Sequence, residues 1–140
     1  MIVNIIFAVL SIVLYFFINS RGLADGPSPT VLNLILSLLF LAFWMLFGIY
    51  RGRERKTSFL IFAIVFWAIG LGVSLVAMNL GPNPFVLVTF AFMAPVNGFM
   101  FFGFMRSKLF IACMFLPLII TCIGYVLGRK KFQNNCDSKN

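Results

Sequence analysis

The sequence of 140 residues contains no histidine and only three carboxylates. These carboxylates, Asp25, Glu54 and Asp137, are spread over the chain and form no pair in the sequence. Without histidine there is no Ser-His or Cys-His nucleophile pair and no histidine-based zinc site. Without neighbouring carboxylates there is no acid–base pair and no cluster for a hard cation. We therefore expect no enzymatic activity, no metal site and no cofactor.

Charge is also missing from five long apolar blocks, which take up most of the chain. Each has about the twenty residues that cross ~30 Å of hydrocarbon at 1.5 Å per residue. Hydrophobic residues make up 62% of the sequence, so a soluble fold of this size would expose much apolar surface. We predict an all-α integral membrane protein with a single domain over residues 1–128. Its five predicted transmembrane helices are residues 1–19, 31–50, 59–80, 85–105 and 109–128.

Cysteine is scarce as well, and the three thiols do not form a framework. Cys113 and Cys122 are nine positions apart in one predicted helix, so they lie on opposite faces and cannot pair. Cys136 is alone in a polar, basic tail, residues 129–140, which we expect to be disordered. The first block has no basic residue before it, unlike a cleavable signal peptide, and we expect it to remain as a membrane helix.

The connectors determine the predicted topology. Only three residues, 106–108, separate the last two blocks, which predicts a tight antiparallel hairpin. With five spans, six basic residues lie on one side and five on the other, so the positive-inside rule is nearly balanced. The dense cluster Arg51–Lys56 favours a cytoplasmic N-terminus in the plasma membrane and an external tail.

Two other arrangements would resolve this near balance of charge. In one, the last hairpin enters the membrane and returns without both helices crossing, which brings Arg129–Lys131 to the cytoplasmic side. In the other, the chain inserts in both orientations and forms antiparallel dimers. The sequence leaves both open.

Small and polar residues form a stripe along each block. Such stripes allow the close approach and the hydrogen bonds that hold helices together in lipid. We expect these faces to point inward while the Phe, Leu and Ile faces meet lipid. The stripes contain Asn4, Ala8, Ser11, Tyr15 and Asn19; Asn33, Ser37, Trp44 and Gly48; Ala63, Gly70, Ser74, Ala77 and Gly81; Ala91, Ala94 and Gly98; and Pro117, Thr121, Gly124 and Gly128.

Two prolines, Pro95 and Pro117, lie near the middle of the last two predicted spans, at similar depth. Each proline frees a backbone carbonyl one turn earlier and kinks its helix. Asn97, Gly98 and Thr121 add polarity nearby, and interrupted helices at the midplane often form binding sites in transporters. We predict a candidate midplane polar site from these five residues. A pair of packing kinks without a ligand is the alternative.

The connector Arg51–Lys56 is the second candidate site. Its basic residues Arg51, Arg53, Arg55 and Lys56 are expected to contact anionic lipid head groups or an acidic partner. A purely topogenic role is the alternative.

No block contains an ionisable group, which argues against ion-coupled transport. We expect a small multi-pass membrane protein, of bacterial origin, that acts through helix–helix contacts. It would be an accessory, regulatory or immunity-type subunit of a membrane assembly, with a membrane-protein partner or a second copy of itself and no nucleic acid. The alternative is a small uncoupled transporter or channel for an uncharged or lipophilic solute.

Overall fold

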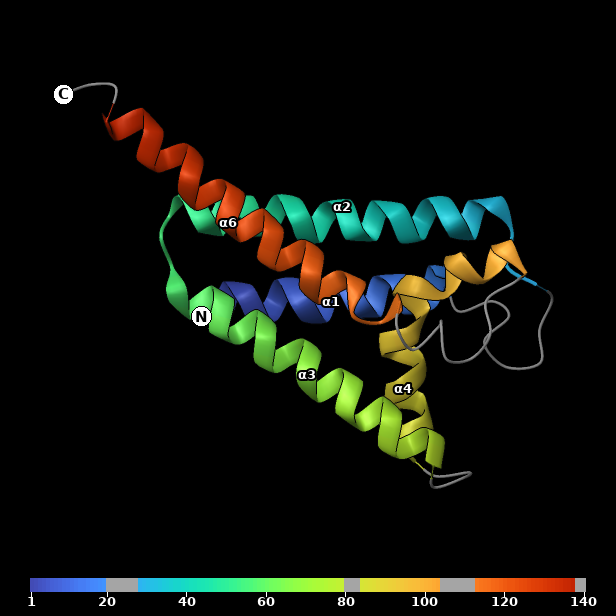
Figure 1. Cartoon of the computed structure of the whole chain (residues 1–140). Helices are drawn as coiled ribbons and strands as arrows, with labels where there is room; N and C mark the ends of the chain where they lie inside the picture. Colours follow the sequence, from blue (N-terminus) through green and yellow to red (C-terminus); the bar gives the residue numbers. More distant parts are fainter. Residues whose placement is uncertain (20–27, 80–83, 104–112, 138–140) are drawn as a thin grey trace.

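The computed structural model describes residues 1–19, 28–79, 84–103 and 113–137, and within these ranges the chain is all-helical, with no strand. The order of elements is shown in Figure 1. They are α1 (Ile2–Asn19), α2 (Val31–Arg53), α3 (Thr57–Asn79), α4 (Phe85–Met93), the 3₁₀ helix η1 (Ala94–Phe102) and α6 (Leu116–Asp137).

Four segments in the described ranges are long and apolar enough to cross a membrane, namely residues 2–19, 31–53, 57–77 and 85–102. The first three agree closely with the predicted helices 1–19, 31–50 and 59–80, which are confirmed as long apolar helices. Helix α2 continues three residues beyond its predicted end and so includes Arg51.

The fourth block is not the continuous helix predicted for residues 85–105. The α-helix ends at Met93, and the chain changes direction and continues as η1 (Figure 1). Pro95 is the second residue of η1 and has no N–H to donate to an α-helical bond, which explains why the break falls here. Gly103, with φ of 64°, ends η1 in the left-handed region that favours glycine.

The fifth block also differs from the prediction of a helix over residues 109–128. Cys113 is helical, Met114 and Phe115 form a turn, and α6 begins at Leu116. The block is thus interrupted just before Pro117, which lies in the first turn of α6, where proline is tolerated. The same helix continues to Asp137, where a disordered tail was expected. The predicted hairpin turn at residues 106–108 lies outside the described residues.

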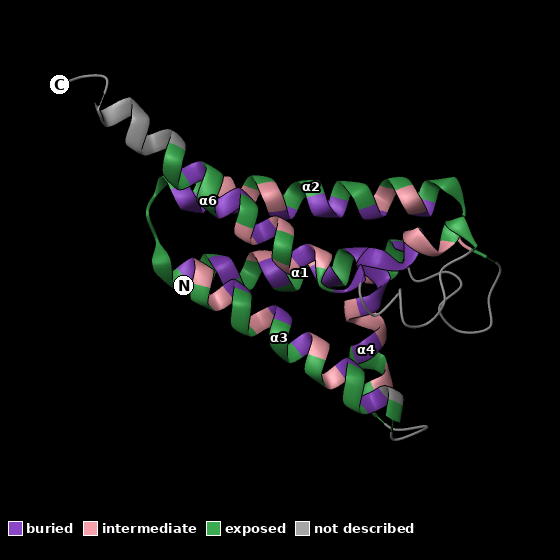
Figure 2. Ribbon diagram, viewed as in Figure 1, coloured by how far each residue is buried: buried purple, intermediate pink, exposed green. Residues whose placement is uncertain are grey.

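An aromatic core lies between α1, α2, α3 and α4. Trp44 and Trp67, with ring centroids 5.0 Å apart, are its centre, and Phe7, Phe40 and Phe92 pack around them. Edge-to-face pairs of this kind stabilise packing beyond the area that they bury. Figure 2 shows the buried residues as stripes on the facing sides of the helices.

The predicted inward stripes are largely confirmed. Ser11 and Ala91 are only half-buried, and Gly81 lies outside the described residues. All the other stripe residues are buried.

Helices α2 and α6 pack closely through glycines and run parallel. Any Cβ on Gly48 would lie 2.7 Å from the Thr121 carbonyl oxygen, and one on Gly52 would overlap the Tyr125 carbonyl. The residue numbers rise together along the two helices, so their C-terminal ends lie at the same end of the bundle (Figure 1). The facing pair Gly124 and Gly128 packs equally closely on α2, as in Gly-x-x-x-Gly helix pairs.

Candidate functional site

Asn19, the last residue of α1, joins three helical segments through its side chain. Its Oδ1 accepts a hydrogen bond from Asn33 Nδ2 at 2.7 Å. Its Nδ2 donates to Ser37 Oγ at 3.1 Å and to the Ala94 carbonyl oxygen at 2.8 Å. The amide therefore connects α1 to two turns of α2 and to the start of η1.

The backbone of Asn19 takes part as well, because its carbonyl oxygen accepts a hydrogen bond from Asn97 Nδ2 at 3.0 Å. Asn19, Ser37 and Asn97 are fully buried. Hydrogen bonds are strong in such a low-dielectric interior, and a network of them fixes the geometry of the elements it joins. We call Asn19, Asn33, Ser37 and Asn97 the amide network.

The amide network replaces a missing bond in the helix ladder. In an α-helix, the Gly98 N–H would donate to the Ala94 carbonyl, four residues earlier. Here the Gly98 N–H donates to Ser37 Oγ at 3.0 Å, while the Ala94 carbonyl accepts from Asn19. Side chains from two other helices thus satisfy the backbone groups at the break, which explains how a long 3₁₀ segment persists.

Gly98 is required by a close approach between η1 and α2. A Cβ at this position would overlap the Asn33 carbonyl group and would stand 2.6 Å from the Leu34 nitrogen. Only glycine leaves room for this contact. Asn33 is held in turn by the helix start, because its Oδ1 accepts from the Thr30 N–H at 2.8 Å and from Thr30 Oγ1 at 2.9 Å.

The structure separates the five residues of the predicted midplane site into two groups. Pro95, Asn97 and Gly98 lie at the break in the fourth block and contact the amide network. Thr121 lies instead against Gly48, about 16 Å along α2 from Ser37 at 1.5 Å per residue. The two groups therefore pack at different positions along α2, and a binding role for these five residues stays a prediction.

Thr121 has a local partner, which explains its burial. Its Oγ1 donates to the Pro117 carbonyl oxygen at 2.6 Å, one turn earlier in the same helix. Both residues are buried, and the backbone of Thr121 packs beside Gly48 of α2. This bond satisfies the hydroxyl inside the helix.

Sequence reasoning placed Asn19, Asn33 and Ser37 on inward faces but did not assign them to a site. Asn19 and Asn33 are the polar residues that end one long helix and begin the next, on either side of the first connector. That pattern was a usable signal for a polar cluster at one end of the bundle. Their contact with η1 depends on the direction that the chain takes after Met93, which the local sequence does not encode.

The basic connector is less accessible than expected, because Arg51 is buried. Its NH1 nitrogen lies 2.7 Å from Glu54 Oε2, and its guanidinium lies over the Phe47 ring at 5.2 Å. Lys56 Nζ reaches the same carboxylate oxygen at 3.2 Å. The hydrogen bond from Arg51 is the main reason that the pKa of Glu54 falls to about 2. Arg51 therefore holds the end of α2, and its burial leaves little of its side chain exposed for the predicted lipid or partner contact.

Arg53, Arg55 and Lys56 are exposed, as a head-group contact requires. Arg129 and Lys130 on α6 are also exposed and lie at this end, because the backbone of Arg129 packs beside Gly52. We call these five residues the basic end. The amide network lies at the other end of α2 (Figure 1).

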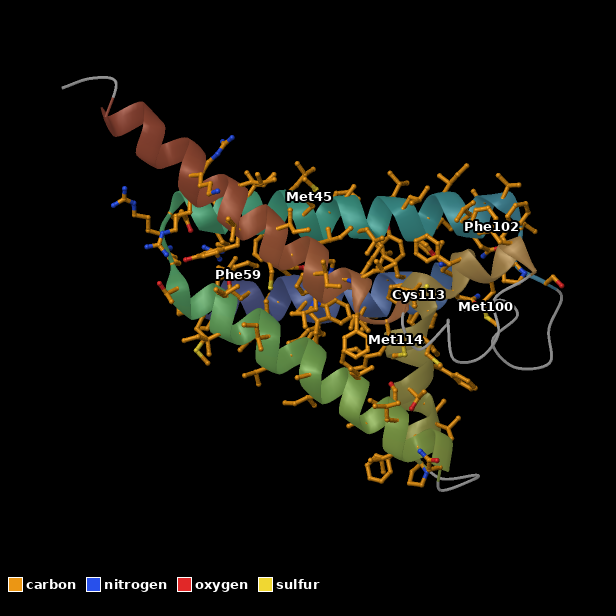
Figure 3. The ribbon with its side chains drawn as sticks, viewed as in Figure 1. Met45, Phe59, Met100, Phe102, Cys113 and Met114 are labelled. Carbon is orange, nitrogen blue, oxygen red and sulfur yellow. The ribbon has the colours of Figure 1, made fainter. Side chains whose placement is uncertain are left out.

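The described residues include no group of three or more His, Cys, Asp or Glu side chains able to hold a metal ion. Met114, which follows Cys113, forms a buried cluster with Met93 and Val96 at the junction of α4 and η1 (Figure 3). No protein-family model, curated protein or solved structure matches the chain.

Proposed function

We propose that this chain is an integral protein of a bacterial plasma membrane and acts there as an accessory, regulatory or immunity-type subunit through helix–helix contacts. The observation that carries the proposal is the set of four hydrogen bonds that join Asn19 to two other elements, α2 and η1. An amide whose donors and acceptors are occupied within the protein fixes helices together and does not offer its groups to a solute.

The outer surface supports the same proposal. The lipid-facing sides of α1, α2 and α3 are rows of exposed Ile, Leu, Val and Phe, and polar side chains point inward. In lipid, such a surface meets acyl chains or another apolar helix. The basic end supports a cytoplasmic location for the N-terminus, since Lys and Arg accumulate on that side.

The proposed topology has α1, α2 and α3 crossing the membrane in full. The segment formed by α4 and η1 enters from the far side and returns to it, because Phe92 packs beside Gly70 in the middle of α3 while Asn97 contacts the end of α1. Helix α6 then returns the chain to the basic end. This is the arrangement in which Arg129–Lys131 share the cytoplasmic side with Arg51–Lys56.

Site-specific photo-cross-linking in native membranes tests the proposed function. A benzophenone side chain is placed at Leu10, Leu39 or Val65, which face outward from α1, α2 and α3. We expect one face to give a discrete protein adduct. The fully buried Phe40 is the matched control position, where only internal adducts are expected. Lipid adducts alone at every outward position would contradict a subunit role.

A thiol at the amide network separates this proposal from the transporter alternative. In a chain without its three native cysteines, Asn97→Cys is exposed to a small membrane-impermeant maleimide. We expect no labelling in the folded protein, because Asn97 is fully buried. Fast labelling that an uncharged solute slows would favour a transport path instead. Thr30→Cys, at the exposed start of α2, serves as the reactive control.

A further inference from the structure

An apolar groove of about 410 Å³ lies between the start of α1 and one side of α3. Met1, the residue before α1, lines one side of the groove, and Ser58, Ile61, Val65 and Ile69 line it from α3. These α3 residues follow one another by steps of three or four and so form one continuous stripe. The groove is therefore elongated along α3.

The length of the groove fits one acyl chain in one leaflet. From Ser58 to Ile69, α3 rises by about 16 Å at 1.5 Å per residue. Half of the ~30 Å hydrocarbon core is about the same length. The groove begins at the basic end of the protein and stops near the middle of the predicted membrane span of α3.

The mouth of the groove is positively charged. Lys56 comes two residues before Ser58, and Arg53 and Arg55 are exposed on the same connector. The only carboxylate there, Glu54, is already bonded to Arg51 and Lys56. The connector therefore presents excess positive charge where a lipid phosphate would lie.

We propose that this groove binds one acyl chain of an anionic phospholipid, whose phosphate lies at the basic connector. The proposal rests on the membrane location proposed above. Charge selects the head group and the groove holds the chain, so an anionic lipid has an advantage over a zwitterionic one with identical acyl chains. The bound lipid would fill the gap between α1 and α3 and brace these helices at the cytoplasmic side.

Intrinsic fluorescence provides the test, because both tryptophans of the chain lie next to the groove. Phe66, which also lines it, has its ring centroid 5.4 Å from that of Trp67 and 5.9 Å from that of Trp44. A bromine atom on the acyl chain quenches tryptophan at short range. The protein is reconstituted in vesicles of unlabelled phosphatidylcholine that contain equal mole fractions of brominated phosphatidylglycerol or brominated phosphatidylcholine.

We expect the brominated phosphatidylglycerol to quench more strongly, with an apparent binding constant at least about five-fold higher. Lys56→Gln should reduce this preference by up to about five-fold, the effect of one basic residue near an anionic leaflet. Arg21→Gln removes the same charge from a different connector, two residues after Asn19 in the sequence, and should leave the preference unchanged.

Two substitutions on neighbouring residues test the groove itself. Val65→Phe narrows the groove and should abolish the difference between the two lipids. Ile64→Phe adds the same bulk one residue away, at an exposed position that does not line the groove, and should preserve it. Neither substitution adds a tryptophan.

Equal quenching by both lipids in the inserted protein overturns this proposal and leaves the membrane location intact. Loss of the lipid preference in both the Val65 and the Ile64 variants also overturns it, because the effect would then not depend on the groove. Absence of quenching by either lipid, together with extraction of the protein by alkaline carbonate, overturns the membrane location itself.

Discussion

At the scale of single residues, Asn19 and Asn4 provide a natural comparison within one helix. Both are asparagines on the buried face of α1. Asn19 makes four hydrogen bonds through its side chain and carbonyl, whereas the Oδ1 of Asn4 has no hydrogen-bond partner among the described residues. The asparagine side chain therefore joins helices at position 19, whereas at position 4 its burial costs desolvation free energy.

Asn19→Leu should destabilise the protein by about 2–3 kcal/mol. It removes three side-chain hydrogen bonds, each worth about 0.6–2 kcal/mol between membrane helices, and part of this loss is offset by the better solvation of leucine in an apolar interior. Denaturation in mixed detergent micelles, followed by circular dichroism, measures the change. Asn4→Leu is the matched control and should be neutral or stabilising. Equal losses in both variants would contradict this role of Asn19.

Glu54 should make stability depend on pH in the acid range. Its pKa is about 2 in the folded protein, below the ordinary value of 4.5, so the folded state binds fewer protons than the unfolded state there. The stabilising contribution is present above pH 4.5 and is lost as the pH falls toward 2. Glu54→Gln should remove most of the dependence of the unfolding free energy on pH between these two values. Arg51→Gln should reduce this dependence too, since Arg51 is the main cause of the shift; a persistent slope would contradict the pairing.

At the scale of elements, the parallel pairing of α2 and α6 depends on four glycines. A Cβ on Gly124 would overlap the Met45 carbonyl, and one on Gly128 would overlap that of Ile49. Backbone carbonyls cannot move aside as flexible side chains do. The two helices would have to separate, which would loosen the rest of the α2–α6 contact.

Gly124→Ala should therefore destabilise the protein by about 1–3 kcal/mol, the usual cost of overpacking. Gly72→Ala is the matched control, because its added Cβ meets no heavy atom within 4 Å beyond its chain neighbours and its own helix backbone in the described part of the chain, and alanine favours the helix. We expect the control to be neutral or slightly stabilising in the same detergent denaturation measurement. A neutral Gly124→Ala would show that α6 does not pack on α2 through this face.

The sequence contained enough information to predict the helices α1, α2 and α3 and the faces that they bury. Those features follow from local properties, namely block length and the spacing of small and polar residues. Pro95 indicated a break in the helix near Ala94. The geometry of the break could not be predicted, because it depends on hydrogen bonds with Asn19 and Ser37, each more than fifty residues away in the chain. The late start of α6 was missed for a related reason: an apolar block does not reveal where within it a helix begins.

At the scale of the whole molecule, the parallel packing of α2 and α6 determines at which end of the bundle the C-terminal part of α6 lies. Arg129 packs beside Gly52, so α6 emerges at the end that carries Arg53, Arg55 and Lys56. With five crossings, the two sides of the membrane would carry nearly equal numbers of basic residues. With α6 ending beside α2, most of the basic residues lie at one end of the bundle. Arg21, Arg106 and Lys108 are the only basic residues between the other blocks.

We therefore expect both termini on the cytoplasmic side, which labelling of single thiols in sealed vesicles can measure. With Cys113 and Cys122 replaced by alanine, Cys136 near the end of α6 should react with a membrane-impermeant maleimide only in inside-out vesicles. With Cys136 also replaced by alanine, Lys56→Cys should behave in the same way, since α2 and α6 end together. Thr30→Cys, at the other end of α2, should react only in right-side-out vesicles. Labelling of Cys136 from the same side as Thr30→Cys would require five full crossings, and the parallel pairing of α2 with α6 would then be wrong.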